Sequence, residues 1–197
     1  MENEVKEPAP KYNFISQEEY LLAEREATEK HEYFQGEVFA ISGASLQHNI
    51  IFHNVYGDIS HKLKGSNCKP FGSDLRIHIP LNSFYTYPDI SMICGKPETP
   101  DESNDTVLNP SVIIEILSKS TKDYDRGTKF HLYRSIKTLK EYILIDSTSV
   151  SVEIYKRQLD DSWILTEFKQ LSSQFVISTI NLTIPLNALY EDVSFEK

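Results

Sequence analysis

The chain has 197 residues and a mass of 22.7 kDa, with 40% hydrophobic and 25% charged residues, which is typical of one compact globular domain. Its apolar runs are only a few residues long, so the sequence excludes a transmembrane helix, which needs about 20 apolar residues. The two cysteines, Cys68 and Cys94, belong to no CxxC or Cys/His motif, which excludes a disulfide framework and a thiolate zinc site. Together with an N-terminus that lacks a basic or apolar region, they favour a reducing, cytoplasmic location.

Charge is distributed unevenly along the chain. The net charge of −9 argues against a protein that coats nucleic acid through bulk attraction. The segment 119–140 nevertheless carries seven basic and two acidic residues. On composition alone this segment is either the solvated face of a helix or a local anion-binding surface, and both interpretations stay open.

The predicted elements follow one another with no internal repeat. Residues 1–13 carry two prolines and several charges, and we expect them to be a flexible lead-in to one domain at 14–197. The expected helices, each begun by a Ser or Thr cap, lie at 17–26, 46–64 and 122–135. The expected strands lie at 33–34, 38–41, 75–79, 84–93, 111–117, 142–145, 150–155 and 163–168.

The order of these elements predicts the fold class. The strand–helix–strand pattern of residues 111–146 is typical of a crossover unit, whereas the strands before and after it pair as antiparallel hairpins. Pro88, inside the strand 84–93, indicates an edge or a bulge there. We therefore expect an α/β fold of the mixed α+β kind, with a mixed central sheet flanked by helices and antiparallel hairpins at both ends.

Glu115 is the residue that most needs an explanation. It stands in the middle of the apolar strand 111–117, where an unpaired carboxylate costs several kcal/mol. A structural salt bridge is one explanation. A second acid, Asp89, follows Pro88 in another expected strand, and two carboxylates on adjacent strands repel each other unless a divalent cation lies between them. Mg²⁺ suits such a pair because it takes one or two carboxylates and keeps its waters.

An ordered series of short motifs extends from about Tyr20 to Tyr155. The series comprises Tyr33 to Val38 with the Gly36-Glu37 turn, His48, Tyr87-Pro88-Asp89, Ile114 to Ser118, Thr121, Asp125 to Lys129, Tyr133, and Glu141-Tyr142 with Asp146. In this order and spacing the chain resembles the PD-(D/E)XK nuclease superfamily, and within it the bacterial Uma-two family of restriction endonucleases. The resemblance implies a restriction-endonuclease-like core. It departs from the superfamily pattern at Leu117, which stands where the superfamily has a lysine.

The resemblance also implies roles for individual residues. Asp89, Glu115 and the backbone carbonyl of Ile116 would hold Mg²⁺, with Mn²⁺ as a substitute. The missing lysine would come from the following helix as Lys129, although Lys119 and Lys122 are closer in sequence and stay rivals. Asp125 and Lys129 are also four residues apart on one predicted helix, so they can equally form a simple ion pair.

The remaining candidates are three acids, three basic residues and one histidine. Glu32 matches the acid that the family has before its Gly turn, and Asp74 opens the strand ahead of Asp89; each is a further ligand candidate, as is Asp125. The substrate-binding candidates are Lys119, Lys122 and Arg126. His48 matches a family position, but a histidine near a helix start is more often structural, and we assign it no chemistry.

Two functions are consistent with the sequence. The first is a Mg²⁺-dependent endonuclease that hydrolyses DNA phosphodiester bonds, with no organic cofactor and no membrane partner; a homodimer is expected because duplex-cutting relatives often pair two active sites. The second is a catalytically inactive module on the same fold that binds nucleic acid or protein. The net charge of −9 favours the second function, and the presence of the Asp89, Glu115 and Lys129 set favours the first.

Overall fold

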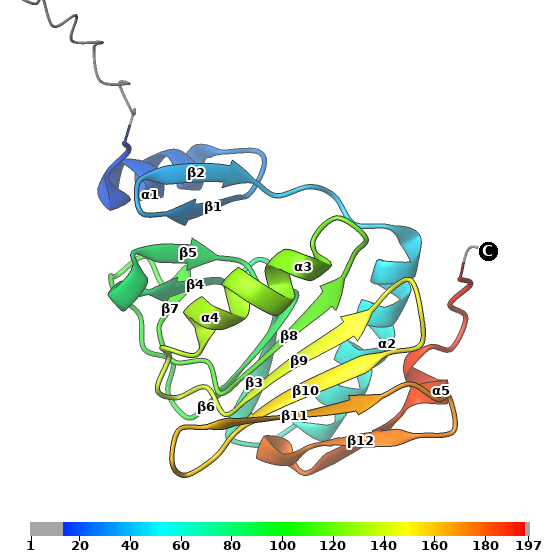
Figure 1. The fold of residues 1–197 in the computed structure, drawn as a ribbon. Helices are drawn as coiled ribbons and strands as arrows, with labels where there is room; N and C mark the ends of the chain where they lie inside the picture. Colours follow the sequence, from blue (N-terminus) through cyan, green and yellow to red (C-terminus); the bar gives the residue numbers. More distant parts are fainter. Residues whose placement is uncertain (1–13, 196–197) are drawn as a thin grey trace, which may run out of the picture.

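The computed structural model describes residues 14–195, in which two main sheets lie side by side (Figure 1). The expected lead-in at 1–13 lies outside the described residues. The strands are β1 His31–Phe34, β2 Glu37–Ala40, β3 Cys68–Gly72, β4 Arg76–Ile79, β5 Phe84–Thr86, β6 Ile90–Cys94, β7 Thr106–Val107, β8 Val112–Leu117, β9 Glu141–Asp146, β10 Val152–Arg157, β11 Trp163–Phe168, β12 Gln174–Ile177 and β13 Leu182–Pro185. The helices are α1 Gln17–Glu26, α2 Leu46–Lys62, α3 Lys122–Tyr124, α4 Phe130–Tyr133 and α5 Leu186–Leu189.

The larger sheet has the strand order β11-β10-β9-β8-β6-β3. Its β8 and β9 are parallel and are joined through α3 and α4, while the other neighbours are antiparallel, so the predicted crossover unit and the mixed sheet are confirmed. Helices cover both faces: α3 and α4 lie in front of the sheet and α2 behind it (Figure 1). Apolar residues of β8 accordingly divide between two core clusters, one with α2 and one with α4. Burial on both faces explains why β8 is almost entirely apolar.

The smaller sheet has the order β2-β1-β5-β4-β7 and was not expected as a separate unit. The expected strand 84–93 is in fact two strands, β5 in the smaller sheet and β6 in the larger one. Pro88 lies in the break between them, where its missing N–H removes a ladder hydrogen bond. Asp89 therefore stands at the point where the chain passes from one sheet to the other.

The helix expected at 122–135 begins at Lys122 as predicted but is irregular. Its middle, Asp125–Lys129, is a π-helical segment between α3 and α4. Such segments are uncommon and occur frequently at functional sites. Here the segment carries Asp125 and Lys129, the two residues that the sequence had placed on one helix face.

Cys68 and Cys94 form a disulfide between β3 and β6. They are directly opposite each other in the antiparallel register of these strands, a proximity that short-range sequence patterns do not reveal. A single bridge is not a disulfide framework, but it removes the cysteine-based argument for a reducing compartment. Among residues 14–195, none of the helices has the length and apolar character needed to cross a membrane.

Candidate active site

Glu115 is buried, with 4% of its surface exposed, on the α4-facing side of β8. One carboxylate oxygen, Oε1, accepts hydrogen bonds from Nζ of Lys129 and from the hydroxyl of Tyr133, both at 2.9 Å. The other oxygen, Oε2, accepts the backbone N–H of Asp89 at 3.2 Å. Both oxygens of the buried carboxylate are therefore hydrogen-bonded, which offsets part of its desolvation cost.

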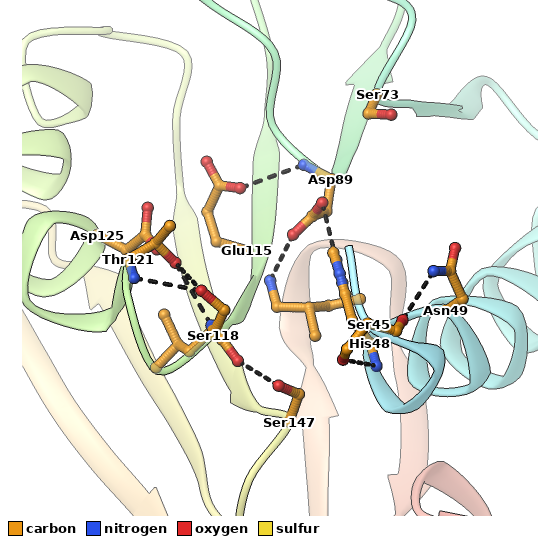
Figure 2. A network of polar contacts seen from close by, with 12 residues as sticks. Ser45, His48, Asn49, Ser73, Asp89, Glu115, Ser118, Thr121, Asp125 and Ser147 are labelled. Carbon is orange, nitrogen blue, oxygen red and sulfur yellow. Dashed lines mark hydrogen bonds and ion pairs between the residues drawn. The ribbon is translucent and has the colours of Figure 1, made fainter. Parts of the chain in front are cut away.

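Asp89 lies next to Glu115, one residue before β6. The antiparallel register of β6 and β8 ends with Ile90 opposite Ile114, and Oε2 of Glu115 accepts the backbone N–H of Asp89 at this end of the ladder. Oδ2 of Asp89 accepts the backbone N–H of Ile116 at 2.7 Å, and Oδ1 lies 3.1 Å from Nε2 of His48 (Figure 2). The two acids, which the sequence analysis singled out, are thus neighbours in the structure.

Lys129 is the cation at the centre of the site. Its Nζ lies 2.9 Å from Glu115, 3.1 Å from Oε1 of Glu32 and 3.7 Å from Oδ1 of Asp125. The side chain is only 9% exposed, so these interactions are poorly screened by solvent. The π-helical segment brings this lysine, rather than Lys119 or Lys122, into contact with the buried acid.

Glu32 joins the β1–β2 hairpin to the site. Besides its ion pair with Lys129, its Oε1 accepts a hydrogen bond from the hydroxyl of Thr86 in β5. Its Oε2 accepts the hydroxyl of Tyr124 at 3.0 Å. Three elements distant in the sequence therefore converge on one carboxylate, which makes Glu32 a closer neighbour of the acid pair than its position before a turn indicated.

The carboxylates of Glu115, Glu32 and Asp125 contact the ammonium of Lys129, and burial shifts the pKa of several groups in this site. Burial raises the pKa of Glu115 to about 8, with Lys129 acting to lower it and Asp89 to raise it further. Burial likewise raises the pKa of Asp89 and of Asp125 above their ordinary values. Burial alone would lower the pKa of Lys129, but Glu115 and its neighbouring groups hold it well above the usual range.

The acids of the site outnumber its one buried lysine, and this excess of carboxylates is the feature that suits a divalent cation. A cation near Asp89 and Glu115 would neutralise like charges that are otherwise held together in a low-dielectric environment. Among residues 14–195, no three or more His, Cys, Asp and Glu side chains form a cluster that could hold a metal ion. The available set is two carboxylates and backbone oxygen, which suits Mg²⁺, an ion that is usually bound through one or two carboxylates and several waters.

The acids lie in a cleft of about 1290 Å³. One wall is the segment 118–122, which contains Lys119 and, at the start of α3, Lys122; another is formed by the end of β2 and the segment that follows it, residues 39–45. Asp89, Glu115 and Lys129 all line the cleft between these walls. A phosphate-bearing ligand in this cleft would therefore meet both the acid pair and unburied basic side chains.

Two of the candidate residues are not brought to the site. Asp74 is fully exposed and its carboxylate contacts Nζ of Lys30 at 3.1 Å. Arg126 points elsewhere, because its guanidinium is held at 2.7 Å by Glu153 of β10. Neither residue lines the cleft, so the metal-ligand role considered for Asp74 and the substrate-binding role considered for Arg126 have no geometric support.

Three side chains acquire a place in the site that sequence patterns did not assign. His48 follows its cap, Ser45, in the first turn of α2, where its ring reaches Asp89. Tyr133 of α4 bonds Glu115, and Tyr124 of α3 bonds Glu32. Membership of the motif series was the sequence signal for His48 and Tyr133, whereas no sequence pattern pointed to Tyr124.

The chain was compared with known proteins. A family model described as "Uma2: Putative restriction endonuclease" matches residues 17–187. This chain belongs to the Uma2 family. Two proteins of Synechocystis sp. (strain ATCC 27184 / PCC 6803 / Kazusa) are similar to it: Uncharacterized protein slr1290 is 34% identical over 95% of this chain and 97% of its own length, and Uncharacterized protein sll1609 is 38% identical over 83% and 93%.

The fold of this Uma2-family chain also occurs in a solved structure. A crystal structure described as a putative nuclease belonging to DUF820, from Anabaena variabilis ATCC 29413, superposes with a TM-score of 0.72. The match covers 89% of this chain and 97% of the other, at 20% sequence identity. The expected family and the mixed α/β fold class are thereby confirmed.

Proposed function

We propose that this Uma2-family protein is a divalent-metal-dependent endonuclease that hydrolyses DNA phosphodiester bonds. The observation that carries the proposal is the proximity of Asp89 and Glu115, joined by the hydrogen bond from the Asp89 backbone N–H, beside the buried Lys129 in the lining of a cleft. The family description as a restriction endonuclease, and a shared fold with a crystal structure described as a putative nuclease, support hydrolysis of nucleic acid. Mg²⁺, with Mn²⁺ as a substitute, is the proposed cofactor.

Asp89, Glu115 and the backbone carbonyl of Ile116 are the proposed metal-binding groups. A bound Mg²⁺ would lower the pKa of a coordinated water and neutralise charge on the scissile phosphate. The protein groups prepare this site in advance. The N–H of Ile116 and the ring of His48 hold the Asp89 carboxylate from two sides, and Tyr133 holds Glu115, so that little reorganisation accompanies binding.

Lys129 is the proposed electrostatic stabiliser of the transition state. Its ammonium is already positioned at 2.9 Å from Glu115 in a buried environment, where a fixed charge stabilises developing negative charge more strongly than in water. Lys119 and Lys122, on the cleft wall, would contact flanking phosphates and position the DNA strand without reading its sequence.

Cleavage of supercoiled plasmid tests this function. We expect the parent protein to nick or linearise plasmid DNA in Mg²⁺ or Mn²⁺ but not in EDTA. Asp89→Asn and Glu115→Gln should abolish cleavage, whereas Asp74→Asn, which removes an exposed acid distant from the cleft, should cut like the parent. A parent protein that cuts no DNA, or acid variants that cut like the parent, would refute the proposal.

A catalytically inactive binding module on the same fold is the second candidate. The net charge of −9 favours it, as do the hydrogen bonds that both oxygens of Glu115 accept from protein donors. The same plasmid experiment separates the two functions, because the module predicts binding without metal-dependent cleavage.

A further inference from the structure

The cleft has an aromatic wall next to the acids. Phe39 of β2 is 48% exposed and lines the cleft. In the β1–β2 register it is directly opposite Glu32, so its ring is on the hairpin face that carries this site carboxylate. Its neighbour Val38 is opposite Tyr33 and therefore on the other face, and Val38 does not line the cleft. The exposed ring is thus aimed into the site.

A second half-exposed aromatic ring, that of Tyr124, lies beside the carboxylate of Glu32. Tyr124 is 38% exposed and lines the cleft, and its hydroxyl donates to Glu32 at 3.0 Å. This hydrogen bond fixes the ring in place and leaves its apolar surface to the cleft. Phe39 and Tyr124 therefore present two aromatic surfaces near Lys129, whose Nζ lies 6.0 Å from the Tyr124 ring centroid.

The segment 118–122, a loop that leads into α3, supplies the complementary charge. Lys119 is exposed and Lys122 is half-buried, and both line the cleft. Among residues 14–195, neither lysine takes part in a salt bridge. Hydroxyls of Ser118, Ser120 and Thr121 lie on the same loop. This wall offers unneutralised positive charge and hydrogen-bond donors, the groups that contact a phosphate backbone.

From these two walls we propose that the cleft binds a DNA segment with unpaired bases, one of which stacks on Phe39 while Lys119 and Lys122 contact the adjacent phosphates. The proposal rests on the proposed nuclease function for the identity of the cut bond, but not for binding. In an intact duplex the base faces are stacked inside the helix, and only base edges and the backbone are accessible to a protein. An exposed aromatic ring beside a basic wall is the combination by which proteins bind single strands.

The binding step is tested by fluorescence anisotropy in Ca²⁺, with a fluorescein-labelled single-stranded oligonucleotide and with the same strand annealed to its complement. We expect the parent to bind the single strand more tightly than the duplex. Phe39→Ala should weaken single-strand binding about 5-fold or more, the effect of losing one base–aromatic stack. Phe39→Trp should retain the affinity, because indole also stacks on bases.

Val38→Ala is the matched control, since Val38 is 38% exposed on the same strand but faces away from the cleft. It should bind like the parent, and melting by circular dichroism checks that each variant is folded. The proposal is overturned if Phe39→Ala binds the single strand like the parent, if the parent prefers the duplex, or if the parent binds neither oligonucleotide.

The plasmid assay keeps this inference separate from the nuclease proposal. Phe39-dependent binding of the single strand by a parent that never cuts DNA would refute the nuclease and leave the inference standing. Metal-dependent cutting by a parent whose Phe39→Ala variant binds and cuts equally well would refute the inference alone.

Discussion

Replacing Asp89 by asparagine separates a metal site from a structural ion-pair network. The amide of Asp89→Asn can still accept the N–H of Ile116 and face the ring of His48, the two contacts that the carboxylate makes. The substitution removes one of the negative charges that crowd around Lys129. Because burial already raises the pKa of the Asp89 carboxyl, its charged form is disfavoured in the folded protein.

We therefore expect Asp89→Asn to raise the free energy of unfolding of the metal-free protein by a small amount. Relief of repulsion between neighbouring carboxylates contributes on the order of 1 kcal/mol of added stability. Mg²⁺ should stabilise the parent by about 3 kcal/mol at one hundred times its dissociation constant. For a chain of this length that corresponds to a rise in Tm of about 5–10 °C. The variant should lose this rise.

Calorimetric melting in EDTA and in Mg²⁺ measures both quantities, with Asp74→Asn as the control for loss of an exposed acid. The control should keep the full Mg²⁺-dependent rise in Tm. A loss of several kcal/mol in the metal-free Asp89→Asn protein would show that Asp89 belongs to a structural network. An unchanged Mg²⁺-dependent rise would place the ion elsewhere.

Three further predictions concern individual side chains. Lys129→Ala should lower the single-turnover rate of DNA cleavage about 10²-fold or more while the Mg²⁺-dependent rise in Tm persists, and an unchanged rate would remove it from the chemistry. Lys119→Ala should instead weaken DNA binding and reduce its salt dependence without lowering the cleavage rate of the bound complex. A lower cleavage rate in the bound complex would make Lys119 the catalytic lysine. Burial lowers the pKa of His78 to about 4, with Arg76 adding to the effect. Because the unfolded state therefore binds more protons between about pH 6.5 and 4, the free energy of unfolding should fall by on the order of 2 kcal/mol as pH decreases through that range. Urea unfolding at several pH values should show this loss reduced in His78→Phe, which keeps the ring stacked on Tyr85; an identical pH slope in the variant would assign the loss to other groups.

Local patterns predicted the parts of the fold whose signals lie close together in the sequence. The serine cap before the helix expected at 17–26 and the apolar run 111–117 are confirmed as a helix start, with Ser16 in a capping box, and as the central strand β8. The strands expected at 33–34 and 38–41 are joined at Gln35–Gly36, with positive φ at both residues, as a two-residue hairpin turn requires. Each of these features depends on interactions within a few residues, which the sequence displays directly.

The parts that could not be predicted depend on long-range pairing. The division of the expected strand at Pro88 into two sheets depends on which strands β5 and β6 find as neighbours, and short periodic patterns do not encode that choice. The same holds for the site. The two strand acids were predictable because a charge in an apolar strand is conspicuous, whereas the contacts of Glu32 with Lys129 and Tyr124 span more than 90 residues of chain.

The most direct test of the metal site is a crystal soaked in Mn²⁺ and examined by anomalous scattering. The account predicts one Mn²⁺ peak between Asp89 and Glu115, with an oxygen of each carboxylate about 2.1 Å away. A peak at any other position, or both carboxylates still bound only to the protein donors seen here at saturating Mn²⁺, would contradict it.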